Sequence, residues 1–237
     1  RQTRQFCDFC KGYGCYECKY TGYTNDESIE GILLPIFTEA FLGEKSILHA
    51  SGREDIDVIT LNTGRPFVIE VVRPIKRKVS LETLLEKVNM NHSDTLMIKN
   101  LRYVDKDCVE KIKMYSEYDE KVYRLVVRFK EKINEEILNK ITNEFKNRVV
   151  FQRTPLRVLF RRKDKVRYKM VYDMNAKLLD DFHAEFIIKC QGGLYVKELA
   201  HGDNNRTIPS IFSISNIELE VLKLDVLSIA PDLELRL

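Results

Sequence analysis

The chain has 237 residues, of which 44% are hydrophobic and 32% are charged, with a formal net charge of +3 and no tryptophan. This length suits one large domain or two small ones, and this composition excludes a disordered chain. No apolar run approaches the roughly 20 residues that cross a bilayer, and residues 1–4 lack the apolar core of a signal peptide. We therefore expect a cytoplasmic protein without membrane contact.

Four of the six cysteines form two CxxC turns near the start of the chain, at Cys7, Cys10, Cys15 and Cys18. Two such turns can supply four thiolates to a structural zinc ion, and disulfide bonds are the alternative. The reducing cytosol favours zinc. The four-residue separation of the turns is shorter than in a usual zinc ribbon, which leaves open whether they share one ion. The CxxCxGxG spacing is similar to the repeats of J-domain chaperones, although Tyr20 replaces a glycine in the second turn.

The periodicity of apolar residues predicts short helices and strands along the rest of the chain. Helices are predicted over residues 30–41, 80–88 and 134–145, with N-caps at Ser80 and Asn134. Strands are predicted over residues 46–50, 66–72, 95–104, 122–129, 166–172, 184–191 and 219–229. This order lacks a regular strand-helix-strand repeat, so we expect an α+β fold with a mainly antiparallel mixed sheet flanked by helices. The cysteine-rich segment would be a small N-terminal appendage.

Positive charge is concentrated between residues 153 and 169, where eight basic residues accompany the single acid Asp164. Such a density suits the phosphate backbone of a nucleic acid, because each cation near a phosphate releases a condensed counterion. The candidate RNA-binding residues are Arg157, Arg161 and Arg162. The alternative is a solvated surface strand.

A polar turn over residues 51–55 contains the run Gly52-Arg53-Glu54-Asp55. Aspartate in a glycine-containing turn is commonly only a turn residue. This run nevertheless resembles the G-R-x-D active-site motif of pseudouridine synthases. Together with residues 56–58 and 64–70, it resembles the archaeal and eukaryotic tRNA pseudouridine synthases for positions 54 and 55 of the TΨC arm. Residues 153–158 and 192–199 are similar to further motifs of that family, so the resemblance spans almost the whole chain.

The resemblance implies the domain organisation. Residues 26–237 would be the pseudouridine synthase catalytic domain, and residues 1–25 would be the cysteine-rich zinc-binding segment. Because the chain starts at Arg1 without a methionine, we expect a separate N-terminal RNA-binding domain to lie outside it. The partner would be tRNA, with no organic cofactor and no obligatory protein partner.

The resemblance also implies residue roles. Asp55 matches the catalytic aspartate, while Asp57 stays open as the alternative nucleophile. Lys197 stands where the family pairs a cation with the aspartate, and such a cation lowers the pKa of the carboxyl. The implied substrate contacts are Arg53, Tyr195, the pocket-lining Leu224, and Tyr123, which would stack on a flipped uracil.

Two other classes of function compete with this interpretation. The first is a non-catalytic zinc-knuckle module that binds RNA and uses Asp55 only as a turn residue. The second is a glycoside hydrolase that uses Glu54, Asp55 and Asp57. That class needs two carboxyls about 5–10 Å apart, flanking a sugar. It also commonly uses tryptophan platforms, and the absence of tryptophan disfavours it.

Overall fold

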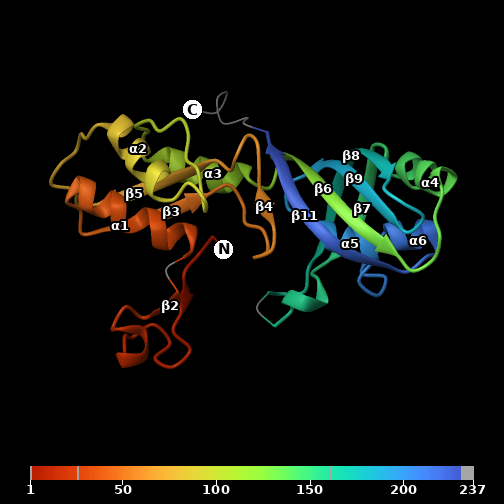
Figure 1. Ribbon diagram of the computed structural model, residues 1–237, viewed down its shortest axis with the longest axis horizontal. Helices are drawn as coiled ribbons and strands as arrows, with labels where there is room; N and C mark the ends of the chain where they lie inside the picture. The colour runs from red at the N-terminus through yellow and green to blue at the C-terminus, as the bar shows by residue number, and fades with distance from the viewer. Residues whose placement is uncertain (1, 26, 161, 231–237) are drawn as a thin grey trace. The chain divides into compact units, whose positions relative to one another are not determined.

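The structure is a computed structural model that describes residues 2–25, 27–160 and 162–230 (Figure 1). It has the predicted α+β architecture with mostly antiparallel strands. Its contacts divide the chain into a first unit of Arg1–Ile56 and Phe67–Lys113 and a second unit of Asp57–Pro66 and Met114–Leu237. No helix in the described ranges is both long and apolar enough to span a membrane.

The cysteine-rich segment opens the first unit. Its antiparallel strands β1 (Gln5–Phe6) and β2 (Tyr23–Asn25) enclose the 3-10 helix η1 (Tyr16–Cys18). Gly22 precedes β2 with a φ of +77°, and a Cβ there would lie 2.6 Å from the backbone oxygen of Gly12. The return of the chain into β2 therefore requires glycine at this position.

Helices and one strand pair build the rest of the first unit. Its elements are α1 (Ile29–Phe41), the antiparallel strands β3 (Lys45–Ala50) and β5 (Phe67–Val72), α2 (Leu81–Asn91), and the start of α3 (Asp107–Tyr115). Ser80 caps α2, as predicted, because its hydroxyl accepts a hydrogen bond from the N–H of Thr83 at 3.2 Å.

The core of the first unit comes from apolar residues spaced four apart on α1 and α2, which share one face of each helix. They are Leu33, Phe37 and Phe41 on α1 and Leu84 and Val88 on α2, joined by Ile98.

The strand predicted over residues 95–104 is wrong, because residues 96–105 have no regular structure. The side chain of Asn89 replaces a neighbouring strand here. Its Nδ2 donates to the carbonyl of Ile98 at 2.9 Å, and its Oδ1 accepts from the N–H of Ile98 at 2.8 Å. With its backbone groups satisfied in this way, Ile98 is buried without joining a sheet.

The second unit is built on a seven-stranded sheet of order β10-β7-β8-β9-β6-β11-β4 (Figure 1). All neighbours are antiparallel except β4, which pairs parallel with β11. The strands are β4 (Ile59–Thr60), β6 (Glu120–Phe129), β7 (Arg148–Arg153), β8 (Val166–Leu178), β9 (His183–Gln191), β10 (Thr207–Ile208) and β11 (Leu219–Ile229). Apart from residues 95–104, the predicted helices and strands are confirmed, although β8 continues beyond its predicted end.

Three helices cover one face of this sheet. They are α4 (Glu135–Phe145), which Asn134 caps as predicted, α5 (Val196–His201) and α6 (Ile211–Ser215). Helix α4 packs on β8 and α5 packs on β11, while α6 contacts both helices. Alternate residues of β6 and β9 are buried beneath them, so the core of the second unit lies between this sheet face and the helices.

Candidate functional site

The Gly52–Asp55 run follows β3 as a loop without regular structure. Gly52 has a φ of +76°, a conformation that favours glycine, and it turns the chain out of the strand. Arg53 is exposed at this point, and Asp55 is half-buried. Asp55 belongs to the first unit, whereas Asp57 begins the segment that contributes β4 to the second unit.

Asp57 and Lys197 form an ion pair within the second unit. The ammonium Nζ of Lys197 donates to both carboxylate oxygens of Asp57, at 2.9 and 2.7 Å. The Lys197 side chain is 19% exposed and that of Asp57 is 66% exposed. The hydrogen bond from Lys197 lowers the pKa of the Asp57 carboxyl despite partial desolvation, and the positive charges of Lys197 and Arg157 act in the same direction. Asp57 is therefore held as a carboxylate.

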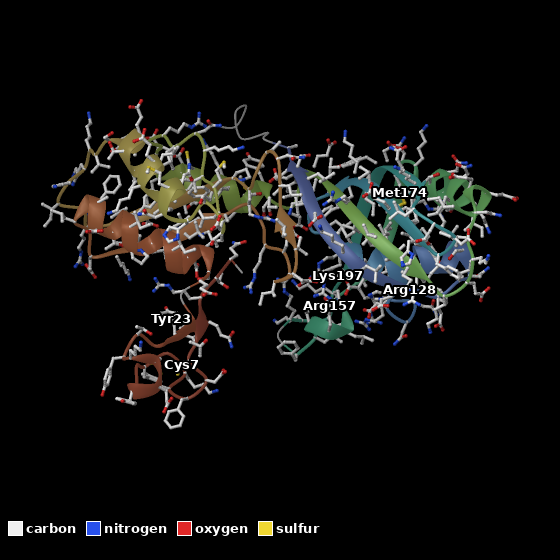
Figure 2. The ribbon with its side chains drawn as sticks, in the orientation of Figure 1. Cys7, Tyr23, Arg128, Arg157, Met174 and Lys197 are labelled. Atoms are coloured by element: carbon white, nitrogen blue, oxygen red, sulfur yellow. The ribbon has the colours of Figure 1, made fainter. Side chains whose placement is uncertain are left out.

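Helix α5 brings two neighbouring residues of opposite charge to this region. Figure 2 labels one of them, Lys197, together with Arg157. Lys197 reaches Asp57, while the next residue, Glu198, is 1% exposed and faces Arg157. The guanidinium of Arg157 donates from Nε to Oε1 of Glu198 at 2.6 Å and from Nη2 to Oε2 at 3.4 Å. Arg157 sits in the 3-10 helix η2 (Leu156–Val158), so this bidentate pair fixes η2 to α5.

Tyr123 and Leu224 lie inside the second unit. Tyr123 on β6 is 2% exposed and Leu224 on β11 is 5% exposed. In the β6–β11 register, Leu224 pairs with Leu125 and Tyr123 pairs with Val226, so all four share the face that the helices cover. Their burial makes both residues part of the core.

Tyr195 lies at the start of α5 beside the basic segment and is half-buried. Nη1 of Arg162 donates to its hydroxyl at 3.0 Å, and the guanidinium of Arg167 lies 5.7 Å from the centre of its ring. Part of the remaining charge in this segment is paired, because Asp164 accepts from Arg153 at 2.7 Å and from Arg206 at 2.6 Å. The predicted contact Arg161 lies outside the described residues.

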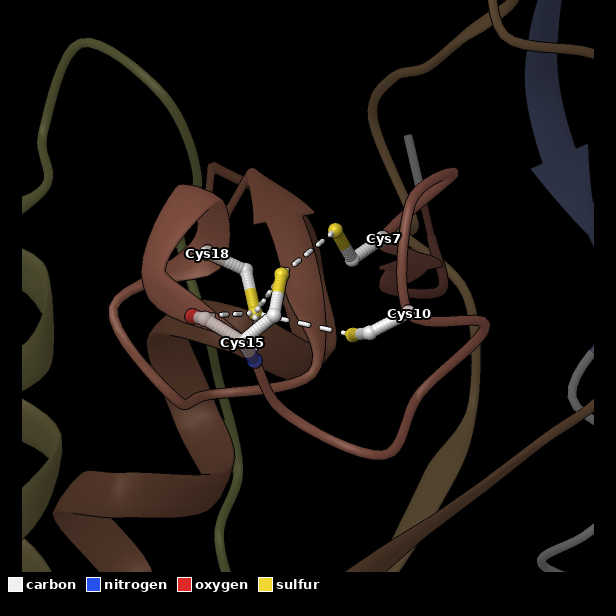
Figure 3. Close-up of side chains that lie close together, drawn as sticks. All are labelled: Cys7, Cys10, Cys15 and Cys18. Carbon is white, nitrogen blue, oxygen red and sulfur yellow. Dashed lines mark hydrogen bonds between the residues drawn. The ribbon is translucent and has the colours of Figure 1, made fainter.

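The four cysteines of the N-terminal segment converge (Figure 3). Their sulfurs all lie within 4.8 Å of one another. The Cys7–Cys15 sulfurs are 3.8 Å apart, and the Cys10–Cys18 and Cys15–Cys18 sulfurs are both 3.7 Å apart. Four sulfurs placed tetrahedrally about 2.3 Å from a zinc ion would be about 3.8 Å apart, whereas a disulfide requires about 2.0 Å. The residues fit one ion shared by both CxxC turns.

Backbone N–H groups point at these sulfurs, as negatively charged thiolates require. Gly14 donates to Cys10 at 3.1 Å, and Cys15 and Gly22 donate to Cys18 at 3.2 and 3.3 Å. Burial raises the pKa of the Cys18 thiol, but these two backbone donors and the neighbouring thiols outweigh it and lower the pKa to about 6. The backbone contact with Cys18 lowers the pKa of Cys15, but desolvation and the other three thiols raise it to about 11. The ligand set is thus only partly preorganised for a cation.

Two charged partners in this region were not predicted from the sequence. The sequence placed Lys197 beside a catalytic aspartate but did not identify Asp57 as the carboxylate that it contacts. Glu198 was visible in the motif of residues 192–199, yet its role as the buried partner of Arg157 was not anticipated. An acid amid apolar residues in a short helix was the available signal, since buried carboxylates are almost always paired.

Known proteins resemble this chain over the segments that carry the site. The family model described as "Pus10, C-terminal" matches residues 9–230. A protein named tRNA pseudouridine synthase Pus10 from Thermofilum pendens is 43% identical over 85% of this chain and 46% of its own length. Its namesake from Methanocaldococcus jannaschii is 42% identical over 96% of this chain and 49% of its own length.

The chain thus spans about half the length of these curated relatives. Among solved structures, one titled as a Cbf5-Nop10-Gar1 complex aligns with a TM-score of 0.47 at 14% identity, over 82% of this chain and 43% of that one.

Proposed function

This chain belongs to the Pus10 C-terminal family, and from that premise we propose that it carries the catalytic part of a tRNA pseudouridine synthase. The single observation that supports this most is the family match over residues 9–230. The match includes the Gly52–Asp55 run, both residues of the Asp57–Lys197 pair and three of the four clustered cysteines. The substrate would be uridine at position 54, position 55 or both in the TΨC arm.

The proposed reaction is an isomerisation, so it needs no redox or organic cofactor. The bond between N1 of uracil and C1′ of ribose breaks, the uracil turns, and its C5 bonds to C1′. The proton on C5 is then lost to water, and N1 gains one, so atoms and electrons balance. The target base must leave the RNA stack to be reached, which requires an aromatic or apolar pocket that holds it.

A single carboxylate is enough to start this reaction. Acting as a nucleophile, it attacks C1′ or C6; acting as a base, it removes a proton to form a glycal. We assign this role to Asp55, on the strength of its place in the G-R-x-D motif. Asp57 is the alternative, and its ion pair with Lys197 supports that reading, because this pair holds the carboxylate ionised at neutral pH.

Further residues are proposed to hold the substrate. Arg53, Tyr195, Lys197, Leu224 and Tyr123 would contact the nucleotide. Tyr195 has the more accessible ring of the two tyrosines, since Tyr123 is 2% exposed. Stacking by Tyr123 therefore requires the base to enter the core beside β6.

The basic segment is proposed to contact the tRNA backbone through Arg157, Arg161 and Arg162. Arg162 is exposed, which suits a phosphate contact, whereas Arg157 is occupied by Glu198 and would contribute mainly by shaping the surface. The four cysteines are proposed to hold a structural zinc ion with no position left for water. The distances between the cysteine sulfurs support this proposal, because they match those of a tetrahedral thiolate site.

Release of tritium from a tRNA transcript that carries 5-tritiated uridine tests the function directly. Only substitution at C5 liberates this label. Release by the protein, with pseudouridine appearing at position 54 or 55, is the expected result. Tight tRNA binding without release would instead support the non-catalytic zinc-knuckle module, and cleavage of the glycosidic bond with free uracil would support a hydrolase.

A further inference from the structure

A residue outside the sequence motifs described above fixes the start of helix α5. Tyr195 is the N-cap of this helix, but its side chain makes no capping hydrogen bond. Helices usually need such a partner, because their first N–H groups have no acceptor within the helix. Something else must fix where α5 begins, and Lys197 follows only two residues later.

Gln152 on β7 supplies that support. Its side chain is completely buried. Its Oε1 accepts a hydrogen bond from the backbone N–H of Tyr195 at 2.8 Å, and its Nε2 donates to the backbone carbonyl of Tyr195 at 3.0 Å. Nε2 also donates to the hydroxyl of Thr207 at 3.1 Å. One side-chain amide thus bonds both backbone groups of a single residue, as a neighbouring strand would.

The orientation of this amide follows from its partners. The N–H of Tyr195 can only donate and its carbonyl can only accept, so the oxygen of Gln152 must face the first and the nitrogen the second. Both hydrogens of Nε2 are used, one on Tyr195 and one on Thr207. A side chain of the same shape that lacked the donor would leave a buried carbonyl facing another oxygen.

Contacts with the loop before β6 also fix the turn that precedes Tyr195, so the start of α5 has little room to move. The N–H of Gly192 donates to the carbonyl of Asp119 at 2.7 Å. A Cβ on Gly192 would lie 2.4 Å from the backbone oxygen of Ser116, so the turn fits tightly against that loop. A helix residue turns about 100° and rises about 1.5 Å, so a shift of the helix start by one residue would carry the ammonium of Lys197 away from Asp57.

We propose that Gln152 is a positioning residue for the reaction: it fixes the start of α5 through the backbone of Tyr195 and so sets the ammonium of Lys197 against Asp57. This inference rests on the proposed function only for its effect on turnover. The placement of Lys197 can be measured independently of any activity.

Two substitutions separate the hydrogen bonds of Gln152 from its volume. Gln152→Leu removes every hydrogen bond. Gln152→Glu keeps the shape and the acceptor but replaces the donor by an oxygen, which can donate again once the carboxyl is protonated. Because burial raises the pKa of a carboxyl, protonation is within reach of mildly acidic pH. Asn134→Ala is the matched control, since it removes the N-cap of α4 and destabilises the same unit without touching α5.

Tritium release at saturating tRNA is compared at about pH 8 and about pH 6, below the melting temperature of every variant. Gln152→Leu is expected to lower turnover about 10- to 100-fold at both pH values while tRNA affinity changes little, because small misplacements of a reacting group act on chemistry. Gln152→Glu should match it at the higher pH and recover towards the parent at the lower one. Asn134→Ala should keep parental turnover at both. Equal impairment of Gln152→Glu at both pH values, or turnover of Gln152→Leu equal to that of Asn134→Ala, overturns the proposal.

A second measurement keeps the inference testable if the parent proves inactive. The Asp57 carboxyl is titrated by carbon NMR in the parent and in the same variants. In the parent its pKa lies below the ordinary range because Lys197 donates to it. Gln152→Leu is expected to move this pKa up towards the ordinary value, and Asn134→Ala is expected to leave it in place. An unchanged titration in Gln152→Leu would overturn the positioning role, whereas absence of tritium release by the parent would overturn only the proposed function.

Discussion

Lys197 donates hydrogen bonds to both carboxylate oxygens of Asp57, although the two residues are 140 positions apart in the sequence. Asp57 lies two residues after Asp55, the aspartate of the G-R-x-D motif. The motif and the ion pair therefore point to different carboxylates. Substitutions at both positions are needed to assign the reaction to one of them.

The two aspartates can be compared by amide substitution, which preserves shape and removes the charge. We expect Asp55→Asn to bind tRNA nearly as the parent does and to release no tritium from 5-tritiated uridine, because an amide cannot attack. Asp57→Asn should retain measurable turnover, at a reduced level because Lys197 loses its carboxylate partner. The reverse pattern, with Asp55→Asn active and Asp57→Asn inactive, would transfer the nucleophile to Asp57.

Removing the ammonium group of Lys197 should make the free energy of unfolding less dependent on pH. The folded-state pKa of Asp57 lies below its ordinary value of 3.8, so the pair stabilises the fold above that value and stops doing so as the pH falls through the folded pKa. Lys197→Met should therefore lower the free energy of unfolding at neutral pH by roughly 0.2–1 kcal/mol, a small loss because the Asp57 carboxylate is exposed. The melting temperature should fall accordingly. The difference from the parent should vanish in acid. A difference that persists at the lowest pH would show that Lys197 acts through packing.

Arg157 is expected to matter for stability more than for RNA affinity. Arg157→Ala leaves the buried carboxylate of Glu198 without its guanidinium, which should cost about 1–3 kcal/mol in unfolding free energy. Adding Glu198→Gln should recover part of that loss, since an amide carries no charge to desolvate. Denaturant unfolding of the two single variants and the double variant forms the required cycle. Additive losses would mean that the two side chains do not interact in solution.

Arg162 offers the contrasting case of an exposed cation. If it contacts a phosphate, Arg162→Ala should weaken binding to every tRNA alike and reduce the salt slope of log Kd by roughly one unit. Turnover at saturating tRNA should stay near that of the parent. Lys177→Ala serves as the control, because Lys177 on β8 is also exposed but lies outside the basic segment of residues 153–169. Identical salt slopes for the parent and both variants would show that the basic segment faces solvent when tRNA is bound.

The cysteine site should hold about one zinc ion per chain in protein purified without chelators. Binding must displace the proton of Cys15, whose pKa is raised to about 11, so zinc affinity should fall as the pH falls. Cys18→Ser should lose the metal in elemental analysis. Cys108→Ala should keep it, because Cys108 is buried away from the cluster on α3. Metal-free parent protein with an unchanged melting temperature would argue against a structural zinc ion.

Local signals predicted most of the fold because they act over a few residues. Ser80 and Asn134 cap α2 and α4 through side-chain oxygens that accept from backbone N–H groups, as their sequence positions indicated. The alternation of apolar residues over residues 166–172 likewise located the start of β8. The strand predicted over residues 95–104 failed because its apolar run was read without the side chain of Asn89, which satisfies the backbone of Ile98.

The site was less accessible to sequence analysis, because it depends on contacts between distant segments. The residue types were identified: an acidic run near residue 55, a cation at Lys197 and an arginine at Arg157. The resemblance implied that Lys197 pairs with the catalytic aspartate, but neither its contact with Asp57 nor the Arg157–Glu198 pair was predicted. The Asp57–Lys197 contact depends on β4 adding to β11 and on α5 packing against the same strand. The four cysteines were identified as ligands from their spacing, which left open whether both turns share one ion, and the structure brings all four sulfurs together.

The ion pair between Arg157 and the buried Glu198 also constrains how this family can diverge. Replacing Arg157 alone leaves the buried carboxylate of Glu198 without its partner, and replacing Glu198 alone removes the acceptor of the Arg157 guanidinium. Neither residue can therefore change independently without a loss of stability. Among related chains, positions 157 and 198 should therefore covary: both charges should be kept, or both replaced together by uncharged residues of similar volume.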